Sequence, residues 1–157
     1  MTRRKAPNRS GKALMGKAHM NKALAQGDYQ LLAQFRSVLR QFLAFSEAAA
    51  HDAGLTAQQH QALLALKAMP GDAPVTVGAL AAQLGIHHNS AVGLVNRLAA
   101  ARLLQRRPDP ADGRRATLVL TAKAERALAT LTAAHRDELR RLTPLLKPLL
   151  TEIGEED

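Results

Sequence analysis

The fold of this chain is decided by Thr76-Val-Gly-Ala-Leu-Ala-Ala-Gln-Leu-Gly-Ile-His-His-Asn-Ser-Ala-Val-Gly-Leu-Val-Asn-Arg-Leu98. Its apolar residues recur at helical spacing in two short runs, which Gly85 and Ile86 separate. Threonine is a preferred residue before the first turn of a helix, and glycine suits the left-handed position that ends one. We therefore predict a helix that Thr76 caps and a second helix from about His87, joined as a helix-turn-helix.

The second of these helices is predicted to bury one face and expose the other. Ala91, Leu94, Val95 and Leu98 share one side at helical spacing. A helix that reads the major groove of DNA must offer hydrogen-bonding groups on its outer face. The expected DNA-contacting residues of this region are Thr76, His87, His88, Asn89, Ser90, Gly93, Asn96 and Arg97.

Gly93 lies inside the second helix, where glycine costs roughly 0.8–1 kcal/mol relative to alanine. Two explanations are equally open at this stage. Either the missing side chain lets the helix approach DNA bases closely, or it permits a tight contact with another helix.

A charged hairpin is predicted directly after the helix-turn-helix. Strand candidates at 103–107 and 116–120 flank the turn-rich segment Pro108-Asp-Pro-Ala-Asp-Gly-Arg-Arg115. We expect Arg114 and Arg115 to reach DNA from this wing, because an arginine can enter a narrow minor groove. Asp112 is expected to brace one of them, and Gly113 leaves open which one occupies the tip. Strand alternation lets at most one of Arg106 and Arg107 face the DNA.

The remaining chain is predicted to be helical. Apolar residues at helical spacing run from Tyr29 to Ala50, and Thr56 with Gln59 forms a capping-box pattern before the next helix. Thr121 is expected to cap a long helix. Because prolines interrupt helices, Pro144 and Pro148 predict a separate final segment from Leu145 to Ile153. The fold class is therefore mainly α with a small β-hairpin wing.

The positive charge of the chain is concentrated at its beginning. The net charge of the 157 residues is +9, and residues 1–27 contain seven bases and no acid. Removing these seven from the 22 bases leaves fifteen, against 13 acids in the rest of the chain. We predict that residues 1–27 form a largely disordered basic arm and that the partner is a polyanion. The seven bases are Arg3, Arg4, Lys5, Arg9, Lys12, Lys17 and Lys22.

Several classes of protein are disfavoured. Without cysteine there is no disulfide, thiolate metal site or cysteine redox switch. The histidines lack metal-ligand spacing, and no phosphate loop or nucleophile elbow occurs. No apolar run of membrane-spanning length and no signal-peptide pattern is visible. We expect a cytoplasmic protein that is not an enzyme and needs no cofactor or metal; a small helical enzyme or metal-dependent hydrolase is the least favoured alternative.

Four segments follow one another in a characteristic order: Gly54–Leu64, Val77–Ile86, His87–Leu98, and Asp109–Arg115 with the later pair Leu120-Thr121. In this order they resemble the MarR family of bacterial regulators. They match the entry to its second helix, its first helix-turn-helix element, a double-histidine version of its recognition helix, and its wing. The resemblance runs from about residue 29 to residue 150.

The resemblance implies one winged helix-turn-helix domain over residues 28–157. Residues 28–53 and 121–153 would form a homodimer through the first helix and the last two helices, and 55–120 would bind double-stranded DNA at a near-palindromic operator. It also implies a repressor that a small aromatic or phenolic ligand releases from DNA, although no ligand-binding residue is identifiable. The alternative from the residues alone is an architectural protein that binds DNA non-specifically through its basic arm.

The chain departs from the family pattern at two informative positions. Asn96 stands where the family commonly has an aspartate that braces a wing arginine, which questions that bracing and leaves Asn96 available for DNA. Arg102 replaces the glycine that commonly ends the recognition helix. If the backbone there is left-handed, arginine costs roughly 1 kcal/mol relative to glycine.

Overall fold

The computed structural model describes residues 26–70, 74–109, 112–113 and 116–154. The predicted basic arm therefore lies outside the described residues, apart from Gln26 and Gly27. Within them the chain forms helices and one antiparallel hairpin, as predicted. The elements are α1 (Gln26–Asp52), α2 (Ala57–Ala68), α3 (Val77–Leu84), α4 (His88–Ala100), β1 (Leu104–Pro108), β2 (Ala116–Leu120) and α5 (Ala122–Gly154).

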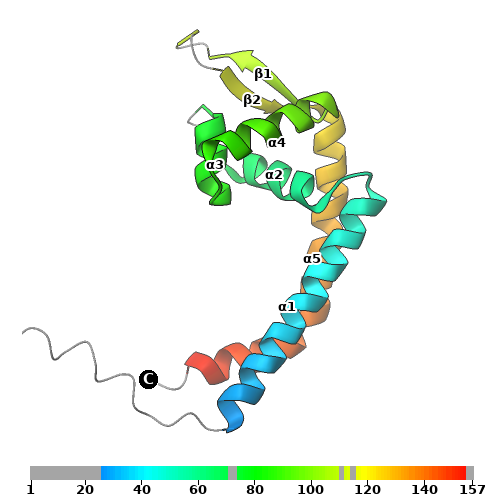
Figure 1. The fold of residues 1–157 in the computed structure, drawn as a ribbon. Coiled ribbons are helices and arrows are strands. Elements are labelled where there is room, and N and C mark those ends of the chain that lie inside the picture. Colours follow the sequence, from blue (N-terminus) through cyan, green and yellow to red (C-terminus); the bar gives the residue numbers. More distant parts are fainter. Residues whose placement is uncertain (1–25, 71–73, 110–111, 114–115, 155–157) are drawn as a thin grey trace, which may run out of the picture.

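These elements form two parts (Figure 1). Helices α2, α3 and α4 and the hairpin gather into a compact body, which we call the winged unit. Helices α1 and α5 run side by side away from it, and we call them the helix pair. No helix in the described part of the chain is long and apolar enough to cross a membrane.

The core of the winged unit draws on every element around it. Leu63 of α2, Leu80 of α3, Leu94 and Leu98 of α4, and Leu131 of α5 are almost completely buried together. Burial of each such side chain contributes about 1.5–3 kcal/mol. The core thus fixes α4 against α2 and α3 and joins the unit to the first half of α5.

The predicted helix boundaries are confirmed by their hydrogen bonds. The Thr56 hydroxyl accepts from the Gln59 amide at 3.1 Å, and the Gln59 side chain accepts from the Thr56 amide at 2.9 Å, which completes the capping box. The Thr76 hydroxyl accepts from the Ala79 amide at 3.2 Å. Gly85 ends α3 in the left-handed conformation, with φ of 62°.

The hairpin pairs β1 with β2 in a register from Leu104 opposite Leu120 to Pro108 opposite Ala116. Buried Leu104 and Leu118 attach it to the core. The Leu118 amide also donates to the Val75 carbonyl at 2.8 Å, so the segment before α3 extends the sheet edge. The base of the wing is therefore held against the helix-turn-helix.

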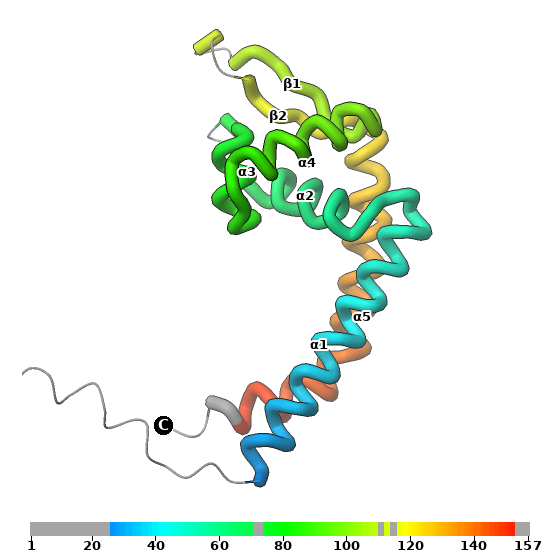
Figure 2. Tube along the Cα trace, in the orientation of Figure 1, coloured from blue at the N-terminus to red at the C-terminus, as the bar shows by residue number. Residues whose placement is uncertain are grey.

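The expectation of a separate final segment is wrong, because Pro144 and Pro148 lie inside α5. Leu142 and Leu149 keep helical spacing across the prolines and pack on Val38 of α1. Continuous packing on α1 offsets the hydrogen bonds that the prolines cannot make. The chain bends instead of ending the helix: Figure 2 shows α5 changing direction before its C-terminal end.

Candidate DNA-binding surface

Helix α4 has the two faces that its sequence predicts. Ala91, Leu94, Val95 and Leu98 are buried in the core. The opposite face points to solvent, with six of the predicted residues exposed and with Thr76 and Gly93 half-buried. The exposed ones are His87, His88, Asn89, Ser90, Asn96 and Arg97.

The start of α4 leaves groups available for an anion. His87 is the residue before the first turn, and its side chain makes no capping hydrogen bond. The backbone amides of the first turn have no partner within a helix and carry a partial positive charge. His88, Asn89 and Ser90 surround these amides with exposed polar side chains. Such an arrangement suits a phosphate and the edge of a base.

The structure distinguishes between the two explanations for Gly93. A Cβ atom built at this position would meet only the Arg97 Nη1 atom, at an ordinary 3.5 Å. Within the described residues, no other helix approaches Gly93 closely. Because Gly93 has no side chain, nothing projects from the outer face of α4 at this position, and a partner can approach the helix backbone closely.

Asn96 links the recognition helix to the wing. Its Oδ1 atom accepts a hydrogen bond from Arg106 Nη2 of β1 at 2.8 Å. The bracing that the Asn96 substitution called into question is thus made, to a strand arginine. The Asn96 amide nitrogen still has two N–H donors to offer. Arg106 lies toward α4, whereas neighbouring Arg107 makes a weak 3.5 Å contact with Gln105.

Arg97 is held by a residue that sequence reasoning missed. Its Nη2 atom donates to Gln58 Oε1 of α2 at 3.1 Å. Both side chains are exposed, so the bond orients the guanidinium without burying it. Nothing in the local pattern around Gln58 indicates this contact, because the two residues meet only when α2 and α4 pack.

The backbone of the turn after α4 is left-handed, which is the condition on which the expected cost of Arg102 depends. Arg102 has φ of 57°. Its carbonyl accepts from the Thr121 hydroxyl at 2.8 Å, and Lys123 Nζ donates to the Ala101 carbonyl at 3.1 Å. The start of α5 thus fixes the turn that leads from the recognition helix into the wing.

The wing tip is only partly described. Arg114 and Arg115 lie outside the described residues, so their expected contact with DNA stays a prediction. Asp112 is described and half-buried. Its expected bracing of a tip arginine also stays a prediction.

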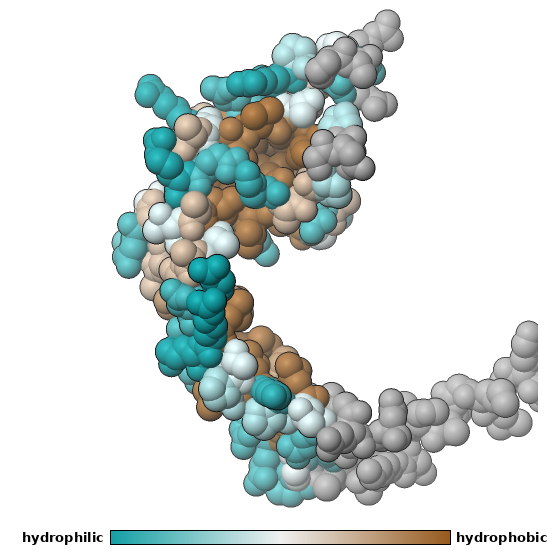
Figure 3. All heavy atoms as spheres, turned by 180° about the vertical axis from the view of Figure 1, so that it is seen from behind, coloured by the Kyte–Doolittle hydropathy of each residue, from teal (hydrophilic) through white to brown (hydrophobic). Residues whose placement is uncertain are grey.

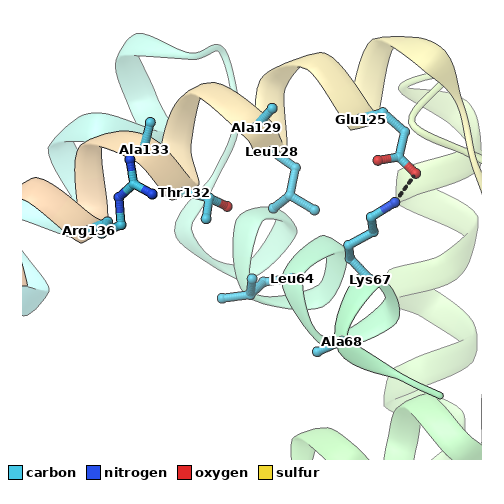
Figure 4. Close-up of a pocket in the computed structure, with 9 residues that line it drawn as sticks. All are labelled: Leu64, Lys67, Ala68, Glu125, Leu128, Ala129, Thr132, Ala133 and Arg136. Atoms are coloured by element: carbon cyan, nitrogen blue, oxygen red, sulfur yellow. Dashed lines mark hydrogen bonds and ion pairs between the residues drawn. The ribbon is translucent and has the colours of Figure 1, made fainter.

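Two cavities lie where the winged unit meets the helix pair. One of about 480 Å³ lies between α2 and α5 and is lined by Leu64, Leu128 and Ala129 (Figure 4). The ion pair of Lys67 and Glu125, at 2.9 Å, closes one end of it. A second cavity, of about 560 Å³, lies against α1, α2 and α5. Sequence reasoning assigned no residue of either cavity to a ligand site.

A family model described as "MarR family" matches residues 53–115, which run from the end of α1 to the wing. No curated protein sequence matches the chain.

Solved structures share the fold. The transcriptional regulator Tm0710 from Thermotoga maritima is 26% identical, with a TM-score of 0.56, covering 83% of this chain and 92% of that one. AbsC from Streptomyces coelicolor, a MarR family transcriptional regulator, is 20% identical, with a TM-score of 0.62 and coverage of 86% and 99%. The MepR–DNA complex of S. aureus is 21% identical, with a TM-score of 0.61 and coverage of 77% and 89%.

Proposed function

We propose that this chain, a member of the MarR family by its matched segment and its fold, is a sequence-specific DNA-binding transcription regulator. The observation that carries the proposal is the outer face of α4. Its polar side chains are exposed while Ala91, Leu94, Val95 and Leu98 are buried, and the wing lies beside it. The solved complex of MepR with DNA supports the same use of this fold.

The residues of this surface have separate proposed roles. His87 and His88 bind backbone phosphates at the start of α4. Asn89 pairs with an adenine edge, and Arg97 donates to a guanine edge or a phosphate. Asn96 positions Arg106 along the DNA backbone. We also assign Thr76, Ser90, Gly93 and the tip residues Arg114 and Arg115 to the DNA contact, with Asp112 as a brace.

We further propose that the protein is a homodimer through the helix pair. Leu32 and Leu43 of α1 and Leu150 of α5 are 58%, 63% and 55% exposed. Figure 3 shows apolar side chains gathered along the helix pair. Apolar patches of this kind favour a protein partner. A two-fold dimer would present two α4 helices to a near-palindromic operator, with half-sites about one helical turn apart.

The regulation that we propose is repression relieved by a small ligand in the cytoplasm. The cavity between α2 and α5 is lined by apolar residues together with a few charged ones, and the second cavity combines Phe42, Leu43 and Leu64 with several polar side chains. Such mixed linings suit a small aromatic or phenolic molecule. A ligand there would change how the winged unit is held against the helix pair. The separation of the two recognition helices, and with it operator affinity, would change.

The test is DNA binding next to the gene that encodes this protein, followed by gel shift and footprinting. We expect one protected region with two half-sites roughly 10 base pairs apart. Changing Arg114 and Arg115 together to alanine should weaken specific binding by about 1–3 kcal/mol per lost contact. Salt-sensitive binding without sequence preference would contradict the proposal.

The matched control is Arg140→Ala, which removes one arginine from the helix pair. Arg140 is exposed, and among the described residues it pairs only with Asp137 on its own helix, at 3.1 Å, so its loss should have little effect on stability. Sedimentation of all variants should show the same oligomeric state. An equal loss of affinity per arginine removed in the control would show that net charge, rather than the wing, is responsible.

A further inference from the structure

A cluster of aromatic rings joins α1, α2 and α5 at the junction of the winged unit and the helix pair. The ring centre of His135 in α5 lies 4.8 Å from that of His60 in α2. It lies 5.7 Å and 5.4 Å from the rings of Phe42 and Phe45 in α1, both edge-on. His60 and His135 also line the 560 Å³ cavity, so space is available beside them.

His135 fits this cluster in either protonation state. Its Nδ1 atom lies 2.7 Å from the Leu131 carbonyl, which can only accept, so this nitrogen carries a hydrogen. Its Nε2 atom lies 2.8 Å from the Ser46 hydroxyl, which can donate or accept. A second proton on His135 therefore leaves both hydrogen bonds in place.

His60 differs from His135, because neither of its ring nitrogens has a hydrogen-bond partner among the described residues. It is buried, and no hydrogen bond or ion pair joins its ring to another described residue. Burial lowers the pKa of His60 below its ordinary value of 6.5, and repulsion from His135 lowers it further. The other groups on the cavity wall around it are Glu47 of α1, which forms no ion pair with it, and the neutral amides of Gln58 and Gln61 on α2.

The cavity wall also leads to the recognition helix. Gln58 precedes His60 by two residues and lines the same cavity. Its Oε1 atom is the acceptor that orients Arg97 of α4, at 3.1 Å. Any movement of the first turns of α2 therefore displaces the partner of a residue on the outer face of α4.

We propose that His60 and His135 form an acid-sensitive junction: a proton on His60 separates α2 from the helix pair and so changes the placement of α4. The separation of α2 from the helix pair is inferred from the ring cluster and does not depend on DNA binding. Its effect on DNA rests on the proposed function. The signal would be acidification of the cytoplasm.

The direction of the pH dependence follows from proton linkage. His60 takes up a proton more readily in the unfolded chain than in the folded chain, because folding lowers its pKa. The stability that neutral His60 provides is therefore complete above the ordinary pKa of 6.5. It decreases as the pH falls below that value.

The first experiment needs no DNA. Thermal unfolding of the wild type, His60→Gln and the control His51→Gln is compared at about pH 7.5 and about pH 5.5, at one protein concentration. His51 is suitable because its side chain is 90% exposed. We expect acid to lower the wild-type and His51→Gln midpoints by at least about 2 °C more than the His60→Gln midpoint. An equal loss in His60→Gln overturns the junction.

A measurement on the wild type avoids any folding defect in the variants. The ring signal of His60 is followed by NMR as the pH falls, together with the backbone amides of α2. We expect the amides around Gln58 to change with the titration of His60. Amides that stay constant through that titration overturn the proposal.

The second experiment measures operator affinity at the same two pH values. His87 and His88 of the proposed DNA-binding surface are present in every variant, so only the difference between wild type and His60→Gln reports on the junction. We expect acid to weaken wild-type binding by a larger factor, and equal factors overturn the coupling. If sequence-specific binding is absent at both pH values, the proposed function is contradicted. The melting experiment is unaffected by that outcome, because it contains no DNA.

Discussion

Arg102 shows how one residue shapes the exit from the recognition helix. Its φ of 57° is a conformation that costs a side chain roughly 1–2 kcal/mol. We predict that Arg102→Gly raises the free energy of unfolding by about 0.5–1 kcal/mol, because relief of strain exceeds the extra freedom of glycine in the unfolded chain. Denaturant unfolding at constant pH measures the change.

The control for this prediction is Ala100→Gly, two residues earlier in the last turn of α4. The same new residue is expected to cost up to roughly 0.8–1 kcal/mol there, since the backbone is helical. Destabilisation in both variants would mean that the left-handed turn is not strained by arginine.

Residue-level features were predictable where the cause is local. Thr56, Thr76 and Thr121 cap helices because their side chains bond to amides three residues ahead, and the spacing is visible in the sequence. The partners of Arg97 and Asn96 were not predictable. Gln58 and Arg106 reach them only after α2 and β1 have packed against α4.

At the scale of elements, Thr121 links the start of α5 to the segment between α4 and β1. Its hydroxyl oxygen accepts from the Ala124 amide at 3.2 Å at the start of α5, and its hydroxyl donates to the Arg102 carbonyl between α4 and β1. We predict that Thr121→Ala lowers the free energy of unfolding by about 1–2 kcal/mol through the lost cap and the unmatched carbonyl. Denaturant unfolding measures this loss.

Thr130→Ala provides the comparison within the same helix. The Thr130 hydroxyl donates only to the Arg126 carbonyl of its own helix, and the residue is exposed. Alanine has the higher helix propensity, so we expect no loss of stability or a small gain. A loss as large as that of Thr121→Ala would show that a general threonine effect, rather than the cap, is being measured.

Helix α5 also marks a limit of sequence reasoning at this scale. Pro144 and Pro148 predict an interruption from local chemistry alone, yet the helix runs through both. The reason lies in another element, because Val38 of α1 packs on Leu142 and Leu149 on either side of the prolines. An element boundary is therefore least predictable where packing on a distant segment opposes local preference.

At the scale of the whole molecule, positive charge is divided between the body and the segment that precedes α1. Seven bases lie within residues 1–25. We predict that deletion of these residues weakens DNA binding and makes it less dependent on salt. The slope of log affinity against log salt should decrease by up to about 6, the value for seven released counterions. Binding titrations over a range of salt concentrations measure the slope.

The same deletion separates a specific regulator from an architectural DNA-binding protein. If the outer face of α4 reads the sequence, the ratio of affinities for the operator and for a scrambled site should survive the deletion, because phosphate contacts add equally to both. A full-length variant with the seven bases changed to glutamine should reproduce the deletion, which would assign the effect to charge instead of length. If the truncated protein loses nearly all affinity and no longer prefers the operator, the basic segment is the binding element and α4 is not.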